Sequence, residues 1–200
     1  MSDGLMLVAG ATGALGQVVV KRMLGDGFRV RALSRDSARL VELARAGAEP
    51  MVADMLDHAA MDRACAGVTD IVSTANNILG KGARSPNRID EAMYRTLGSA
   101  ARDAGVRRWV HVSARDLTAD SPVDFFRVKV RVEQIVRESG VPWVAIRPSA
   151  FMISGRGCCS GMPSGRERSR PSSGAATSPA TSSPWKTLRR SSSPSCMTRR

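Results

Sequence analysis

Three glycines near the N-terminus have the spacing of a phosphate-binding loop. Gly10, Gly13 and Gly16 directly follow a short apolar run over residues 5–8, which predicts a buried strand, a tight turn and then a helix. Gly10 and Gly13 are expected to adopt backbone angles closed to residues with a Cβ and to admit a pyrophosphate, while Gly16 lets the helix pack against the strand. The free N–H groups that open the helix would face the phosphates, and Thr12 would add a hydroxyl. This predicts a dinucleotide-binding site; an ordinary glycine-rich turn is the alternative.

The residues after the second expected strand indicate which dinucleotide is preferred. A protein that binds NAD usually places a carboxylate about twenty residues after the glycines, whereas an arginine there pairs with the 2′-phosphate of NADP. Here the residues are Ser34 and Arg35, with Arg39 one turn along the next helix. Because a guanidinium matches a phosphate through two parallel hydrogen bonds, Arg35 favours NADP, and NAD is the second choice. The alternative is a solvated surface arginine beside Asp36.

Two further segments are expected to border the cofactor. Asp54 follows the third expected strand, where a carboxylate can accept a hydrogen bond from the adenine amino group; an acid at the start of the next helix is the alternative, and the two roles are compatible. Thr74, Ala75 and Asn76 end the fourth expected strand. Their small size suits a close approach of the backbone to the ribose and pyrophosphate.

Strands and helices alternate along the chain. After the glycine loop, apolar residues repeat at helical spacing at Leu15, Val18, Val19 and Met23. This pattern predicts an α/β fold, a doubly wound parallel sheet of about six strands with ligands at the carboxyl ends of the strands. Further strands are expected over 28–33, 48–54, 70–75, 107–114 and 141–147, and helices over 36–46, 57–66, 89–105 and 125–140.

The composition changes abruptly at Ser154. The last 47 residues hold 13 Ser, 8 Arg, 5 Pro and 5 Gly, and they carry a net charge of +8 out of +12 for the whole chain. Such a segment buries too little apolar area to fold, so residues 1–153 are expected to form one domain and residues 154–200 a disordered basic tail. Two explanations compete, a genuine tail that binds an acidic partner and an out-of-frame translation of a GC-rich gene, and we favour the second. Nucleic acid is not expected as a partner, since no aromatic residues interleave the charges.

The cysteines and the N-terminus indicate a cytoplasmic location. The four cysteines show no metal-ligand spacing and no disulfide framework, so no metal is expected, and Cys65 is interpreted as a small buried apolar residue. The first residues lack the basic region of a signal peptide, and no apolar stretch is long enough to span a membrane.

Several motifs in order resemble one superfamily. These are GATGALG, RALSRD, VADMLD, VSTA, AARDAGVRRWVHVSA, Lys129 with the Val-Glu that follows, SGVPW and IRPSAFM. Over about residues 4–153 the chain is similar to the atypical short-chain dehydrogenases/reductases, in particular their NmrA-like, NAD(P)H-binding branch. The resemblance implies a Rossmann-type domain followed by a smaller C-terminal substrate region, and we expect that region to be missing from this chain. The stretch from Pro148 to Phe151 resembles the loop that the family places against the nicotinamide.

The resemblance also implies catalytic positions. Active members of the superfamily use a tyrosine four residues before a lysine, with a serine at the end of the fifth strand. Lys129 and Ser113 match the lysine and the serine, but Phe125 stands at the tyrosine position. Phenylalanine has no proton to donate, so reduction of a carbonyl with a tyrosine acid is disfavoured. Lys129 is expected on the nicotinamide ribose, with a solvated lysine as the alternative, while Tyr94 is expected to pack and His111 to be buried.

Two classes of function remain open for such a chain. One is an NADP-dependent oxidoreductase that passes hydride directly to a quinone-like acceptor, with turnover weakened by the lacking substrate region. The other is a non-catalytic redox sensor that reports to a regulatory protein partner. The expected cofactor contacts are Gly10, Ala11, Thr12, Gly13, Leu15, Gly16, Ser34, Arg35, Asp54, Met55, Thr74, Ala75, Asn76 and Lys129.

Overall fold

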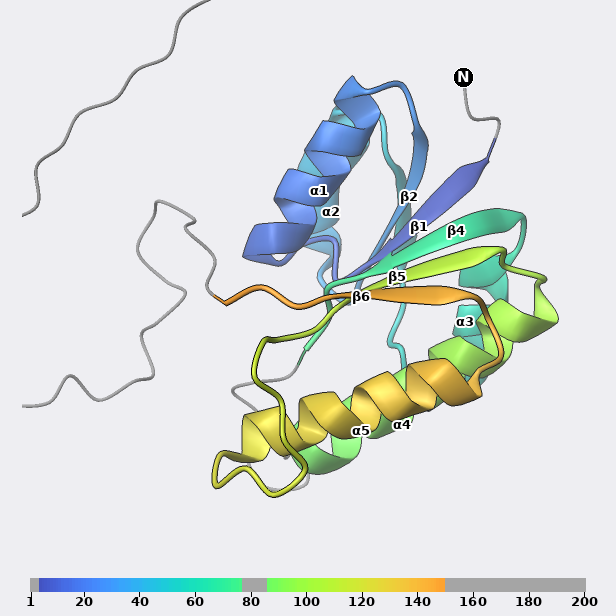
Figure 1. The fold of residues 1–200 in the computed structure, drawn as a ribbon. Helices are drawn as coiled ribbons and strands as arrows, with labels where there is room; N and C mark the ends of the chain where they lie inside the picture. The colour runs from blue at the N-terminus through green and yellow to red at the C-terminus, as the bar shows by residue number, and fades with distance from the viewer. Residues whose placement is uncertain (1–3, 77–85, 150–200) are drawn as a thin grey trace, which may run out of the picture. The chain divides into compact units, whose positions relative to one another are not determined.

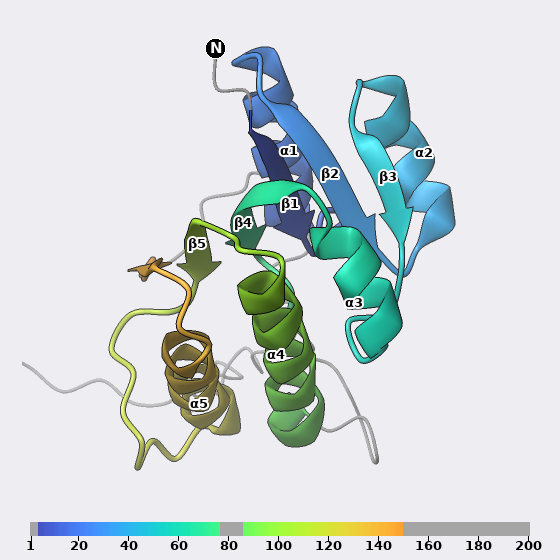
Figure 2. The same ribbon diagram turned by 90° about the vertical axis from the view of Figure 1, so that its right-hand side faces the viewer.

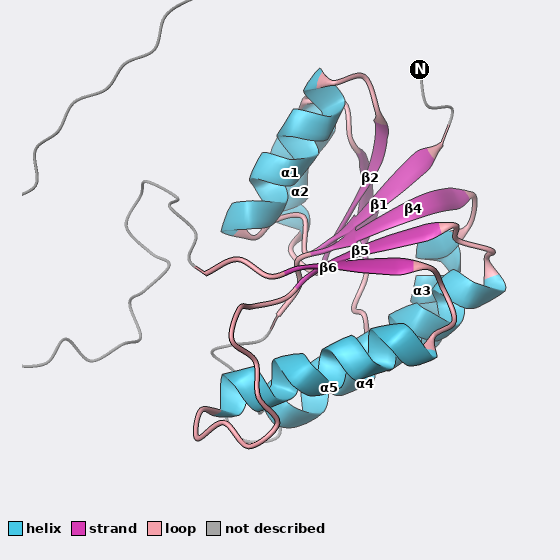
Figure 3. Ribbon diagram, viewed as in Figure 1, coloured by secondary structure: helices cyan, strands magenta, loops and turns pink. Residues whose placement is uncertain are grey.

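The computed structural model describes residues 4–76 and 86–149, and the expected alternation of strands and helices is confirmed within them (Figures 1 and 3). The strand expected over 70–75 starts and ends two residues earlier, so Thr74, Ala75 and Asn76 follow the strand instead of ending it. The elements are β1 (Leu5–Ala9), α1 (Ala14–Gly25), β2 (Arg29–Ser34), α2 (Ser37–Arg45), β3 (Glu49–Val52), α3 (His58–Cys65), β4 (Val68–Ser73), α4 (Pro86–Asp103), β5 (Arg108–Val112), α5 (Asp124–Glu138) and β6 (Trp143–Ile146).

The strands form one six-stranded sheet in the order β3-β2-β1-β4-β5-β6. Every pairing is parallel, so the fold is the expected doubly wound, Rossmann-type sheet. The order runs outward from β1 to β2 and β3 on one side and from β4 to β6 on the other. The switch point therefore lies between β1 and β4, and the crevice at the carboxyl ends of these two strands is where such sheets bind ligands.

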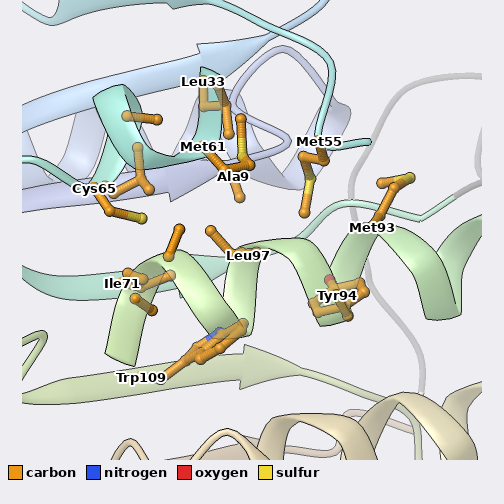
Figure 4. Close-up of a cluster of buried hydrophobic side chains, with 14 of the residues drawn as sticks. Ala9, Leu33, Met55, Met61, Cys65, Ile71, Met93, Tyr94, Leu97 and Trp109 are labelled. Atoms are coloured by element: carbon orange, nitrogen blue, oxygen red, sulfur yellow. The ribbon is translucent and has the colours of Figure 1, made fainter. Parts of the chain in front are cut away.

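Helices cover both faces of the sheet, as parallel strands require. α1 and α2 lie on one face, and α3, α4 and α5 lie on the other (Figures 1 and 2). The buried apolar residues form two hydrophobic cores, and alternate residues of β1 pack into each of them. Leu7 and Ala9 pack under α3 and α4, whereas Val8 packs against α1. The larger core also holds Tyr94 and Trp109, both fully buried (Figure 4).

The apolar residues of α1 do not all lie on its buried face. The helix buries Gly16 and Val20, whereas Val18 is 56% exposed. The physical reason is the glycine: the helix approaches the loop most closely at the residue without a side chain, and this sets which face is turned inward.

One face of the sheet carries apolar side chains that reach solvent. Val144 and Ile146 of β6 are 57% and 51% exposed, while Trp143 in the same strand packs into the larger core. All described residues belong to one compact unit. The tail expected over 154–200 and Phe151 lie outside the described residues.

Candidate dinucleotide-binding site

The glycine loop joins β1 to α1 with little space to spare. Gly10 has φ +85°, in the left-handed region that favours glycine, and a Cβ there would lie 2.7 Å from the Ala75 nitrogen. A Cβ on Gly16 would lie 2.1 Å from the Gly10 carbonyl oxygen. Gly13 was expected to adopt backbone angles closed to residues with a Cβ, but its φ of −68° is one that any residue can adopt. Two of the three glycines are thus required by the backbone.

Backbone hydrogen bonds hold this loop between β2 and β4. The amides of Gly10 and Ala11 both donate to the Leu33 carbonyl, at 3.2 and 3.1 Å. From the other side, the Thr74 amide donates to the Ala9 carbonyl at 2.9 Å, and the Thr74 hydroxyl donates to the same oxygen at 3.1 Å. The loop is therefore fixed before any ligand arrives, as a preorganised site requires.

The start of α1 has no side-chain cap. Its N-cap is Gly13, which makes no side-chain hydrogen bond, whereas α2 and α3 are capped by the carboxylates of Asp36 and Asp57. The opening turn of α1, which includes the half-buried Leu15, thus presents backbone N–H groups that no side chain caps. Such a helix start suits the two negative charges of a pyrophosphate.

Two hydroxyls meet beside the loop. Thr12 Oγ1 and Ser34 Oγ lie 2.6 Å apart, and Ser34 Oγ also accepts from the Asp36 amide at 3.1 Å. The Thr12–Ser34 bond uses one of the two hydroxyl hydrogens, whichever residue donates. The second hydrogen is available to an oxygen of a ligand, so these two expected residues act as a pair.

The residues after β2 and β3 come together at the next corner of the sheet. Arg35 Nη1 lies 3.9 Å from the Asp54 carboxylate, and both side chains are partly exposed. Asp54 accepts from the Leu56 amide at 3.1 Å, while the helix cap is Asp57, so the alternative role of Asp54 as the acid that opens the helix is wrong. Met55 is 5% exposed and points into the larger core, so its backbone alone faces the corner (Figure 4).

Lys129 is buried beneath the end of β5. It is 3% exposed, which excludes the solvated lysine that was the alternative, and its Nζ lies 3.4 Å from the Val112 carbonyl oxygen. The same Nζ lies 5.7 Å from the centre of the Phe125 ring, one helical turn away. Phe125 thus places an apolar ring at the position where active members of the superfamily have the tyrosine that donates a proton.

Charged groups surround this lysine. Burial lowers the pKa of Lys129, and Asp90 and Glu133 act in the opposite direction. Burial opposes the ionisation of Glu133, but the hydrogen bond and the positive charge of Arg147 lower its pKa overall. Arg147 Nε donates to Glu133 at 2.9 Å. A nearly buried carboxylate therefore stays charged near the lysine.

A second buried polar group was missed from the sequence. Ser73 Oγ accepts from Trp109 Nε1 at 2.8 Å and lies 2.9 Å from His111 Nδ1. Tyr94 donates to the Ala75 carbonyl at 2.8 Å. The expected packing of Tyr94 and burial of His111 are confirmed. Their hydrogen bonds to Ala75 and Ser73 could not be predicted, because they depend on how distant segments pack together. The sequence indicated only that Trp109 and His111 lie on the same face of β5, since side chains alternate along a strand.

The expected residues thus gather in two groups. The first surrounds the carboxyl ends of β1 to β4 and comprises the glycine loop, Thr12, Ser34, Arg35, Asp54 and residues 74–76. The second comprises Ser113 and Lys129 at the end of β5. A glycine loop at one side, an arginine at the far corner and a buried lysine along the same sheet edge fit an extended dinucleotide.

Known proteins agree with this geometry. A model of the NAD(P)H-binding family matches residues 10–168. The chain is 37% identical over 149 residues to a (4-alkanoyl-5-oxo-2,5-dihydrofuran-3-yl)methyl phosphate reductase of Streptomyces griseus, covering 74% of this chain and 48% of that protein. It is 29% identical over 148 residues to an NAD(P)H azoreductase of Xenophilus azovorans, covering 74% and 49%.

A solved structure is similar as well. The NADPH-dependent quinone oxidoreductase QOR2 of Escherichia coli, in complex with NADPH, has a TM-score of 0.59 and 28% identity over 71% of this chain and 48% of its own. The chain spans about half the length of the curated relatives it matches. No helix among the described residues is long and apolar enough to cross a membrane. The family model covers most of the sequence, so the NAD(P)H-binding family that the resemblance implies is confirmed: the chain belongs to the NAD(P)H-binding family.

Proposed function

We propose that this chain binds NADPH in preference to NADH and supports direct hydride transfer to a quinone-like acceptor. The observation that carries the proposal is the phosphate-binding loop, in which Gly10 and Gly16 leave no room for a Cβ beside an uncapped helix start. Bound NADPH supplies a hydride at its nicotinamide ring, and conjugated acceptors take it up without a tyrosine acid.

Each residue of the crevice has a proposed role. The amides that open α1 hold the pyrophosphate, and the Thr12–Ser34 pair donates its free hydrogen to a phosphate or ribose oxygen. Arg35 pairs with the 2′-phosphate and Asp54 accepts from the adenine amino group. The remaining contacts are Ala11, Gly13, Leu15, Met55, Thr74, Ala75 and Asn76, through their backbones or small side chains.

We assign two roles at the end of β5. Lys129 Nζ holds the nicotinamide ribose. One of its three N–H donors bonds the Val112 carbonyl, and the other two are left for the ribose hydroxyls. Ser113 orients the oxygen of the acceptor. The relatives are about twice as long as the matched region, so we propose that the acceptor pocket draws on the half that this chain does not match. The buried, free thiol of Cys65 is consistent with the cytoplasmic location that we also propose.

Phe125 supports a second candidate, a non-catalytic sensor of the NADP/NADPH ratio that acts on a regulatory protein partner. A phenylalanine at the acid position is compatible with binding without turnover. Oxidation of NADPH in the presence of a panel of quinones and azo dyes separates the two candidates. Turnover that falls when Lys129 is replaced by methionine supports the oxidoreductase, whereas NADPH binding without oxidation by any acceptor supports the sensor.

A further inference from the structure

A buried tyrosine holds the backbone beside the phosphate-binding loop. Tyr94 of α4 is fully buried, and its hydroxyl donates to the Ala75 carbonyl at 2.8 Å. Ala75 follows β4, and a Cβ on Gly10 would lie 2.7 Å from its nitrogen and 2.8 Å from its Cα. The tyrosine therefore fixes a residue that touches the glycine loop at the switch point of the sheet.

The geometry of the peptide bond extends this contact to Asn76. The Ala75 carbonyl and the Asn76 N–H belong to one trans peptide unit, in which they point in opposite directions. Because the carbonyl is directed at Tyr94 inside the core, the Asn76 N–H is directed away from the core. Asn76 is itself exposed, so its N–H is turned to the side from which a ligand approaches the carboxyl ends of the strands.

The phenol is held rigidly enough to orient a peptide. Its ring stacks on Trp109, with ring centres 6.3 Å apart and planes 17° apart, and it meets His111 edge to face at 5.0 Å. Burial raises the pKa of Tyr94, and the Ser73 hydroxyl beside it acts in the opposite direction. The phenol therefore stays protonated and remains a hydrogen-bond donor wherever the protein is folded.

We propose that Tyr94 is a positioning residue for the cofactor, which through its hydrogen bond to Ala75 orients the Asn76 N–H as a donor to a ribose or phosphate oxygen of the dinucleotide. This inference rests on the proposed function, because it takes the dinucleotide to lie along Gly10 and residues 74–76. It adds a residue on α4, a helix from which no cofactor contact was expected.

The test compares two variants that each remove one buried hydroxyl from α4. Tyr94→Phe removes the donor to Ala75, whereas Thr96→Val removes a hydroxyl that bonds the Ala92 carbonyl at 3.1 Å on the same helix. Calorimetric titration with NADPH should give a Kd about 3- to 10-fold higher for Tyr94→Phe, the effect of one lost hydrogen bond, and an unchanged Kd for Thr96→Val. Thermal unfolding of both variants controls for stability.

A spectroscopic readout separates positioning from a merely structural role. The amide signal of Asn76 in a nitrogen–proton correlation spectrum should shift downfield when NADPH is added to the wild-type chain, and this shift should be lost in Tyr94→Phe. If Tyr94→Phe does not fold, the wild-type signal decides, since an Asn76 amide that does not respond to NADPH overturns the inference.

The outcomes separate this inference from the proposed function. A wild-type chain that is folded but binds no NADPH overturns both. A wild-type chain that binds, together with Tyr94→Phe that binds equally well or with Thr96→Val that binds equally poorly, overturns this inference alone.

Discussion

Replacing Gly16 by alanine tests the phosphate-binding loop at its most crowded point. The new Cβ would lie 2.1 Å from the Gly10 carbonyl oxygen and 2.9 Å from Ala11 Cα, where ordinary contact begins near 3.4 Å. All of the nearest atoms belong to the backbone, so no side chain can rotate away. The loop or the start of α1 must therefore move by about 1 Å, as overpacked sites do.

The expected magnitude has two parts. Overpacking of this kind costs about 1–3 kcal/mol of the free energy of unfolding. The movement also displaces the amides that face the pyrophosphate, and a hydrogen bond to a charged group contributes about 1.5–3 kcal/mol. The loss of one such bond raises the Kd for NADPH at least about tenfold, since about 1.4 kcal/mol corresponds to a factor of ten.

Gly25→Ala is the matched control, because Gly25 ends the same helix and no atom outside the adjoining helix backbone lies within 4 Å of its ideal Cβ. Alanine favours a helix over glycine by about 0.5–1 kcal/mol, so this variant should bind NADPH like the wild type and lose no stability. Calorimetric titration and thermal unfolding followed by circular dichroism measure both quantities. If Gly16→Ala keeps wild-type affinity and stability, the pyrophosphate does not lie on this loop.

Three further predictions address single side chains. Arg35→Ala should raise the Kd for NADPH about tenfold and leave that for NADH within about twofold; parallel titrations measure this, and equal losses for the two cofactors would refute a contact with the 2′-phosphate. Burial lowers the pKa of His111 from 6.5 to about 3, so the unfolded chain takes up a proton there below pH 6.5 that the folded chain does not. The free energy of unfolding should therefore fall between pH 6.5 and pH 5, by at most about 1.4 kcal/mol per pH unit from this group. In urea titrations, His111→Gln should make the free energy of unfolding less dependent on pH; an unchanged dependence would contradict the lowered pKa of His111. Burial raises the pKa of the Cys65 thiol to about 12, so iodoacetamide at pH 8 should label Cys65 only after denaturation, as peptide mapping by mass spectrometry would detect; rapid labelling of the native chain would show that the thiol is accessible.

The fold was predictable because it depends on the local strand and helix patterns and on their order along the chain. Alternating strands and helices separated by glycines specify a parallel sheet, and the expected segments coincide with the observed ones to within a few residues. The inner face of α1 was not predictable from apolar spacing, because close packing at Gly16 selects it. The extent of β4 was also missed, since its pairing with β1 and β5 determines where the strand ends.

The site was predictable to the extent that its residues are neighbours in sequence. The glycine loop and Arg35 follow from spacing along the chain, but the Thr12–Ser34 pair joins residues 22 positions apart. The contact of Tyr94 with Ala75 spans 19 positions and a helix whose orientation the sequence does not specify. The burial of Lys129 likewise depends on how α5 packs against β5, which no local pattern states.

Calorimetric titration of this chain with NADPH and, separately, with NADH is the direct test of dinucleotide binding at the glycine loop. We expect NADPH to bind at one site with a Kd at least about tenfold lower than that of NADH, because the 2′-phosphate adds a charged pair with Arg35. A chain that circular dichroism shows to be folded and that binds neither cofactor would contradict the assignment of the site.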